Sequence, residues 1–157
     1  MSLAHVDRLK NTRHVMVALP EAPIKVSVAI ITDREGRILI TQRAAHISHG
    51  GFWEFPGGKV ELYESPEMAL LREVKEEVGL NVVSYRYLGE VHHRYDEYQV
   101  ILYGYHVQNH FGEASCCESQ TGLCWTPLND LEKYNFPLAN KELIRCYTAL
   151  KTNQNII

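Results

Sequence analysis

Three glutamates of the chain have a spacing that suits metal-assisted phosphate chemistry. Glu73, Glu76 and Glu77 stand at i, i+3 and i+4 of a segment with a helical apolar pattern, so their carboxylates share one face within about 100° of arc. Like charges at this spacing destabilise a helix, and Arg72 can neutralise only part of the charge. Mg²⁺ binds carboxylate oxygens and is commonly shared with substrate phosphates. Taken alone, the cluster favours an ordinary solvated acidic helix face, and it is the surrounding sequence that favours a magnesium site.

The helix that must hold these glutamates has clear predicted ends. Ser65 is the expected N-cap, with proline at the next position, and Gly79 is the expected stop. Between them Leu71, Val74 and Val78 fall within about 60° of arc at helical spacing. This narrow apolar stripe predicts that the helix packs on a sheet.

Segments rich in β-branched and aromatic residues predict the strands of that sheet. The first two predicted strands are expected to form a hairpin around a turn at residues 33–36. A last helix is expected near residues 141–150, where apolar residues recur at helical spacing. Strands with helices on the outside predict an α+β domain. The predicted strands are residues 24–31, 38–41, 85–91, 98–106 and 123–126.

Length and composition limit the domain organisation and the classes of partner. The 157 residues suit one domain, and 45% hydrophobic with 22% charged residues is typical of a globular protein. We expect a leader at residues 1–23, the domain at 24–150 and a tail at 151–157. The formal net charge of −3 gives no broad basic field, so a nucleic-acid polymer is not an expected partner.

Two further features bear on where the protein works. No apolar run approaches the roughly 20 residues that span a bilayer, so no membrane partner is expected. The four cysteines lack the paired CxxC spacing of a zinc site, and no signal peptide precedes them. We therefore expect reduced thiols and a cytoplasmic location.

The glutamates also belong to a longer pattern. Gly58 is followed by five residues, Glu64, seven residues and then the run Arg72-Glu73-Val74-Lys75-Glu76-Glu77-Val78-Gly79-Leu80. Every specified position matches the Nudix box Gx5Ex7REUxEExGU, in which U is aliphatic. The chain thus resembles the Nudix hydrolases. The resemblance implies an α/β/α sandwich with a mixed central sheet, and hydrolysis of a nucleoside diphosphate linkage with Mg²⁺, for which Mn²⁺ can substitute.

The same resemblance implies roles for the residues of the box. Arg72 would orient Glu73 through a charge-assisted hydrogen bond, and Glu64 would brace the loop against the helix. Glu118 resembles the additional loop glutamate of these enzymes, so Glu73 and Glu118 both stay candidates for the general base. The implied metal ligands are the backbone carbonyl of Gly57 and the side chains of Glu73, Glu76, Glu77 and Glu118.

Residues 40–45, 53–59 and 136–140 resemble the MutT-type branch of the family. The resemblance implies a monomer that acts on a small nucleoside triphosphate, converting 8-oxo-dGTP to 8-oxo-dGMP and pyrophosphate and so preventing mutation. Tyr98 stands where this branch has an arginine, so the contacts to the sugar of the nucleotide depart from those of the branch. The implied substrate contacts are Arg43, Phe55, Tyr95 and Asn140, of which Asn140 would read the oxidised purine.

Each of these assignments has an alternative. Phe55 and Tyr95 can be core aromatics, Arg43 a charge at a sheet edge, and Asn140 the N-cap of the last helix. The substrate can be another nucleotide, such as a CTP-type pyrimidine or a nucleotide sugar, because the box fixes the cleaved bond and not the base. A catalytically silent nucleotide-sensing module is a further alternative, but it would be expected to lack box carboxylates, and all are present.

Overall fold

A computed structural model describes residues 21–155 of the chain. Local sequence signals explain the ends of the first described helix, α2. Ser65 precedes it and accepts a hydrogen bond from the Met68 N–H, and Gly79 ends it in the left-handed conformation with φ 76°. The elements in chain order are β1 (Ile24–Ile31), β2 (Ile38–Gln42), β3 (Trp53–Glu54), β4 (Gly57–Lys59), α2 (Pro66–Val78), β5 (Asn81–Arg94), β6 (Gln99–Phe111), β7 (Gly122–Thr126), the 3₁₀ helix η2 (Leu128–Lys133) and α3 (Leu138–Gln154).

The strands form two sheets. The larger has the order β4-β1-β6-β5, in which β1 and β6 are parallel and the other pairs antiparallel. The smaller has the order β3-β2-β7 and is antiparallel throughout. A single bridge between Thr32 and Ile38 joins β1 to β2. The predicted mixed sheet is therefore confirmed.

The predicted hairpin between β1 and β2 is wrong. The turn itself forms, since the Gly36 N–H donates to the Asp33 carbonyl at 3.1 Å, but it carries the chain from one sheet to the other. Each of the two strands is central in its own sheet and has a different partner on each side. The buried aliphatic residues of β1 and those of β2 therefore lie in two different sheets.

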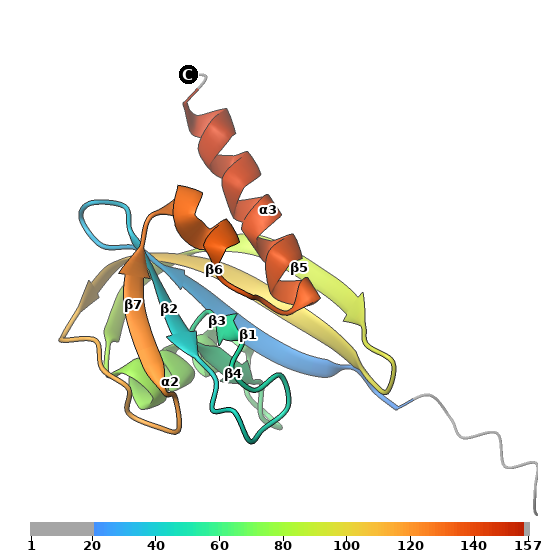
Figure 1. Cartoon of the computed structure of the whole chain (residues 1–157). Helices are drawn as coiled ribbons and strands as arrows, with labels where there is room; N and C mark the ends of the chain where they lie inside the picture. The colour runs from blue at the N-terminus through green and yellow to red at the C-terminus, as the bar shows by residue number, and fades with distance from the viewer. Residues whose placement is uncertain (1–20, 156–157) are drawn as a thin grey trace, which may run out of the picture.

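The helices cover opposite faces of the larger sheet (Figure 1). Alternation along β1 divides the core accordingly, because successive side chains point to opposite faces of a strand. Val28 and Ile30 pack in the cluster that includes Leu143 of α3. Ala29 and Ile31 pack in the cluster with Leu70, Val74 and Val78 of α2. The predicted α/β/α sandwich is confirmed.

The predicted apolar stripe of α2 was wrong at one position. Val74 and Val78 are fully buried, but the third core residue is Leu70, and Leu71 is 43% exposed. Two of the three predicted positions are thus correct, and the third lies at the adjacent residue. The buried hydroxyl of Ser27 in β1 donates to the Pro66 carbonyl and attaches the start of the helix to the sheet.

The remaining elements are longer than predicted. β5 extends beyond residues 85–91 at both ends, and β6 begins at residue 99 and extends past residue 106. Helix α3 begins before residue 141 and continues past residue 150 into the predicted tail. Most of the predicted leader, residues 1–20, lies outside the described part of the chain. Between residues 21 and 155, no helix combines the length and the apolar character needed to cross a membrane.

Candidate functional site

Arg72 joins the loop after β4 to helix α2. Its Nε and Nη2 atoms donate to the two carboxylate oxygens of Glu64, both at 2.8 Å, and Nη2 also donates to the Lys59 carbonyl at 3.0 Å. Its Nη1 donates to Glu73 at 2.7 Å and to Glu76 at 3.2 Å. The hydrogen bonds from Arg72 lower the pKa of Glu64 to about 2. The hydrogen bonds to Glu64 are the contacts expected if Glu64 braces the loop against the helix. The hydrogen bond to Glu73 is the contact expected if Arg72 orients Glu73.

Glu73 lies under the loop, and two glycines let the backbone come close. The Glu73 side chain is 14% exposed, and this burial raises the pKa of its carboxyl group against the opposing effect of Arg72. A Cβ atom on Gly58 would overlap the Glu73 carboxylate, and one on Gly57 would overlap the Ser27 carbonyl of β1. Only glycine fits at these two positions without moving the carboxylate or the strand.

Glu77 is the second carboxylate held by the loop. The Gly57 N–H donates to Glu77 Oε2 at 3.1 Å. Burial raises the pKa of Glu77 to about 8, and the negative charges of Glu54, Glu73 and Glu118 add to the effect. The predicted ligand residues Gly57 and Glu77 are thus neighbours. Glu54 and Glu73 form ion pairs with Arg43 and Arg72, but within residues 21–155 no ion pair is made to Glu77 itself.

Glu118 comes from a different part of the chain. It lies in an exposed bend after β6, where its backbone N–H donates to Gln120 Oε1 at 3.2 Å. The bend is attached to the end of α2, because the Ser115 and Cys117 N–H groups donate to the Val78 and Glu77 carbonyls at 3.0 and 2.9 Å. The Glu118 charge raises the pKa values of both Glu73 and Glu77, so the fold brings this carboxylate toward the helix.

The donor set suits a hard divalent cation. Carboxylates that raise one another's pKa values are stabilised when a cation such as Mg²⁺ lies between them, and oxygen is the ligand that Mg²⁺ prefers. In the structure, Glu73 and Glu76 form ion pairs with Arg72. In residues 21–155 no three histidine, cysteine or acidic side chains stand close enough together to hold an ion without a shift.

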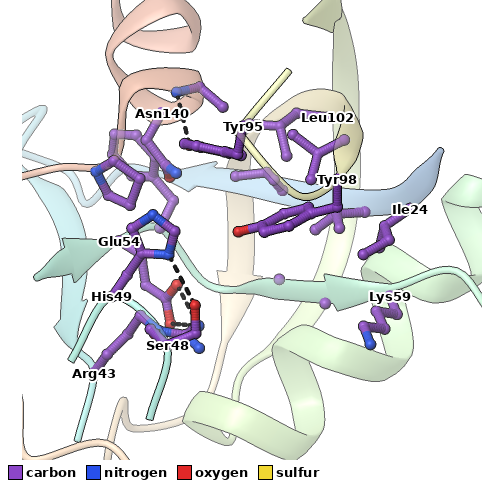
Figure 2. Close-up of a pocket in the computed structure, with 18 of the residues that line it drawn as sticks. Ile24, Arg43, Ser48, His49, Glu54, Lys59, Tyr95, Tyr98, Leu102 and Asn140 are labelled. Carbon is purple, nitrogen blue, oxygen red and sulfur yellow. Dashed lines mark hydrogen bonds and ion pairs between the residues drawn. The ribbon is translucent and has the colours of Figure 1, made fainter. Parts of the chain in front are cut away.

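A cavity of about 480 Å³ begins at this carboxylate cluster. Its walls include Gly57, Gly58 and Glu77 at one end, and all four predicted substrate residues: Arg43, Phe55, Tyr95 and Asn140. Figure 2 shows Arg43 and Glu54 on one side of the cavity and Tyr98 on the other, and the ring of Tyr95 contacts that of His49. The cavity therefore joins two of the predicted metal ligands, Gly57 and Glu77, to the predicted nucleotide residues, whereas Glu73, Glu76 and Glu118 do not line it.

Arg43 has a fixed position in the wall. Its Nε donates to the Ser48 carbonyl at 2.9 Å, and its Nη1 forms an ion pair with Glu54 Oε2 at 3.1 Å (Figure 2). Burial raises the pKa of Glu54, although Arg43 opposes the shift. Glu54 was not among the predicted site residues. Its position one residue before Phe55, in a segment already assigned to the pocket, is the signal that could have identified it.

The aromatic residues serve both the core and the cavity. Phe55 is buried and stacks on Phe136 with ring centroids 5.2 Å apart, so the core alternative is right in part. Tyr95 is half-buried, and its ring contacts His49, His93 and Tyr98 at centroid distances of 5.2, 4.5 and 5.2 Å. Sequence reasoning missed His49, because a histidine in a glycine-rich loop carries no periodic signal.

Asn140 is not a helix cap. The N-cap position of α3 is Pro137, and Asn140 lies in the first turn, so the capping alternative is wrong. Asn140 lines the cavity (Figure 2), and no protein group in the described residues 21–155 hydrogen-bonds to its side-chain amide. A donor and an acceptor are therefore available at the cavity wall.

Comparison with known proteins agrees with this geometry. The family model for the NUDIX domain matches residues 27–146. The CTP pyrophosphohydrolase of Escherichia coli (strain K12) is 36% identical over 125 residues, covering 79% of this chain and 91% of that protein. The 8-oxo-dGTP diphosphatase of the same strain is 34% identical over 121 residues, covering 77% and 93%. A structure from a study of MutT from Aliivibrio salmonicida and Vibrio cholerae has a TM-score of 0.68 at 35% identity, covering 79% of this chain and 95% of that one.

Proposed function

Because this chain belongs to the Nudix hydrolase family, we propose that it hydrolyses nucleoside triphosphates to the monophosphate and pyrophosphate, with 8-oxo-dGTP as its main substrate. Nudix hydrolases use divalent metal ions, and we propose Mg²⁺ here, with Mn²⁺ able to substitute. The four cysteines of the chain are free thiols, which supports a reducing compartment, the cytoplasm. We propose that the enzyme acts as a monomer, since one chain supplies the whole cavity.

The observation that carries this proposal is the continuous cavity. A nucleoside triphosphate has a planar base at one end and phosphates at the other. The cavity matches this order, since Phe55, Tyr95 and Asn140 line one part and Glu77 with Gly57 lines another. Its volume of about 480 Å³ lies in the range of small-molecule sites.

The chain's own residues have separable tasks in this reaction. A bound metal ion supplies neutralisation of phosphate charge and a more acidic water. Arg72 fixes the orientation of Glu73, and the Gly57 N–H fixes that of Glu77. Glu118 has no ion pair in the described chain, whereas Glu73 is engaged by Arg72. This difference favours Glu118 as the general base and Glu73 as a ligand.

Selection of the oxidised base rests on Asn140. Oxidation of guanine at C8 turns N7 from an acceptor into a donor, and the Asn140 amide offers an acceptor for it. With Asn140 Oδ1 facing N7, the unoxidised base would place an acceptor against an acceptor, which costs roughly 1–3 kcal/mol per unpaired buried group. Asn140→Ala should therefore reduce the preference for 8-oxo-dGTP over dGTP by about tenfold or more.

A second substrate class is CTP-type pyrimidines. One observation favours it: the E. coli CTP pyrophosphohydrolase is as similar to this chain as the 8-oxo-dGTP diphosphatase, at 36% and 34% identity. Tyr98, which stands where MutT-type enzymes have an arginine on the sugar side, lines the same cavity, so the contacts to the sugar would differ from those of that branch.

A substrate panel tests the proposal. Purified enzyme with Mg²⁺ is incubated with 8-oxo-dGTP, the four dNTPs, the four NTPs and a nucleotide sugar, and pyrophosphate release is measured. The proposal expects the highest kcat/KM for 8-oxo-dGTP. A maximum at CTP would support the second class, and binding without turnover of any nucleotide would reject the enzymatic function.

A further inference from the structure

The start of helix α3 lacks the usual side-chain cap. The first N–H groups of a helix have no partner inside the helix and are normally satisfied by a Ser, Thr, Asp or Asn side chain at the N-cap. The N-cap of α3 is Pro137, which offers no side-chain acceptor. The N–H groups of the first turn must therefore be satisfied by other parts of the protein or by water.

The hydroxyl of Tyr95 supplies this acceptor. The Ala139 N–H donates to Tyr95 Oη at 3.2 Å, although the two residues are 44 positions apart (Figure 2). Tyr95 belongs to the turn between β5 and β6, where its own N–H donates to the Tyr98 carbonyl at 2.8 Å. The hydrogen bond thus ties the hairpin turn to the end of α3 that faces the cavity.

The ring that carries this hydroxyl is held from several sides. Its neighbours His93 and Tyr98 come from the β5–β6 hairpin, and His49 comes from the loop after β2. A ring packed in this way has few rotamers open to it, so the hydroxyl points consistently at the helix. Asn140, the next residue after Ala139, lines the same cavity.

We propose that Tyr95 is a positioning residue for base selection: its hydroxyl caps helix α3 through the Ala139 N–H and thereby holds the Asn140 amide at the cavity wall. The inference rests on the proposed function, because it assumes that Asn140 reads the base. It assigns the hydroxyl a task separate from that of the ring. The ring can contact the nucleotide, whereas the hydroxyl acts through the helix.

The substitution Tyr95→Phe tests this, because it removes the hydroxyl and keeps the ring. The ratio of kcat/KM for 8-oxo-dGTP to that for dGTP should fall by about three- to tenfold, as expected for one lost hydrogen bond. The change should lie in KM for 8-oxo-dGTP, with kcat preserved. Amide hydrogen exchange at Ala139 should become faster. Tyr147→Phe is the control, since it removes a tyrosine hydroxyl from α3 at a residue that does not line the cavity, and it should leave both readouts unchanged.

A double-mutant cycle separates the possible outcomes. If the hydroxyl acts through Asn140, Tyr95→Phe has no further effect on the ratio in an Asn140→Ala background. The same fall in both backgrounds would overturn the inference, because the hydroxyl would then contact the substrate directly. An unchanged ratio in Tyr95→Phe, with only a lower melting temperature, would also overturn it. Failure of the wild-type enzyme to prefer 8-oxo-dGTP would instead refute the proposed function.

Discussion

The substitution Gly58→Ala should inactivate the enzyme through one carboxylate. A Cβ atom at this position would lie 2.5 Å from each carboxylate oxygen of Glu73, whereas ordinary contacts begin at 3.4 Å. The carboxylate must therefore retreat by about 1 Å. Misplacement of a catalytic group by about 1 Å costs on the order of 10²-fold in rate, or about 3 kcal/mol of transition-state stabilisation.

The assay is kcat for pyrophosphate release with Mg²⁺, together with circular dichroism and thermal unfolding to show that the fold is intact. Backbone geometry at residue 58 does not require glycine, because φ there is not positive. We therefore expect a folded protein with a specific catalytic defect.

A double-mutant cycle tests whether the effect passes through Glu73. In a Glu73→Ala background there is no carboxylate to displace, so Gly58→Ala should cost little more. Two outcomes would refute this reasoning: full activity of Gly58→Ala, or equal losses with and without Glu73.

Three further predictions follow from the site and the core. Activity should disappear in chelator, return with Mg²⁺ or Mn²⁺ and fail with Ca²⁺, since the carboxylates need a small octahedral ion; full turnover in chelator would reject the metal. Glu76→Gln should lower kcat on the order of 10³-fold with an unchanged melting temperature. Glu76 is half exposed, so the substitution removes a ligand charge and no packing contact of the core. Burial lowers the pKa of His106 from 6.5 to about 4, and the positive charges of Lys151 and Arg86 contribute. As the pH falls through this range, His106 stays neutral in the folded protein, while in the unfolded chain it takes up a proton. The free energy of unfolding should therefore fall as the pH decreases from about 6.5 to about 4, more steeply than in His106→Gln; denaturant titrations across this range that coincide for the two proteins would contradict the assignment.

The features that sequence predicted correctly are those with local causes. The ends of α2 follow from Ser65 and Gly79, whose capping contacts involve residues within one turn. The box residues also act locally, because Glu64, Arg72 and Glu73 meet across a single loop and helix. The resemblance to a known motif supplied their roles, which geometry alone does not give.

The errors arise where distant parts of the chain decide the outcome. β1 pairs with β6 because both are buried central strands, and nothing in the turn at residues 33–36 reveals that choice. Leu70, and not Leu71, packs in the core with Ala29 and Ile31 of β1, a contact between distant parts of the chain. His49 joins the cavity only through the packing of its loop against Tyr95.

The most direct test of the central claim is a competition experiment. The enzyme is given equal concentrations of 8-oxo-dGTP, dGTP and CTP in one reaction with Mg²⁺, and chromatography follows the decay of each, which reports the ratios of kcat/KM without separate calibrations. We predict that 8-oxo-dGTP is consumed first, with a ratio over each competitor of at least about tenfold. Faster consumption of CTP or dGTP would contradict the account.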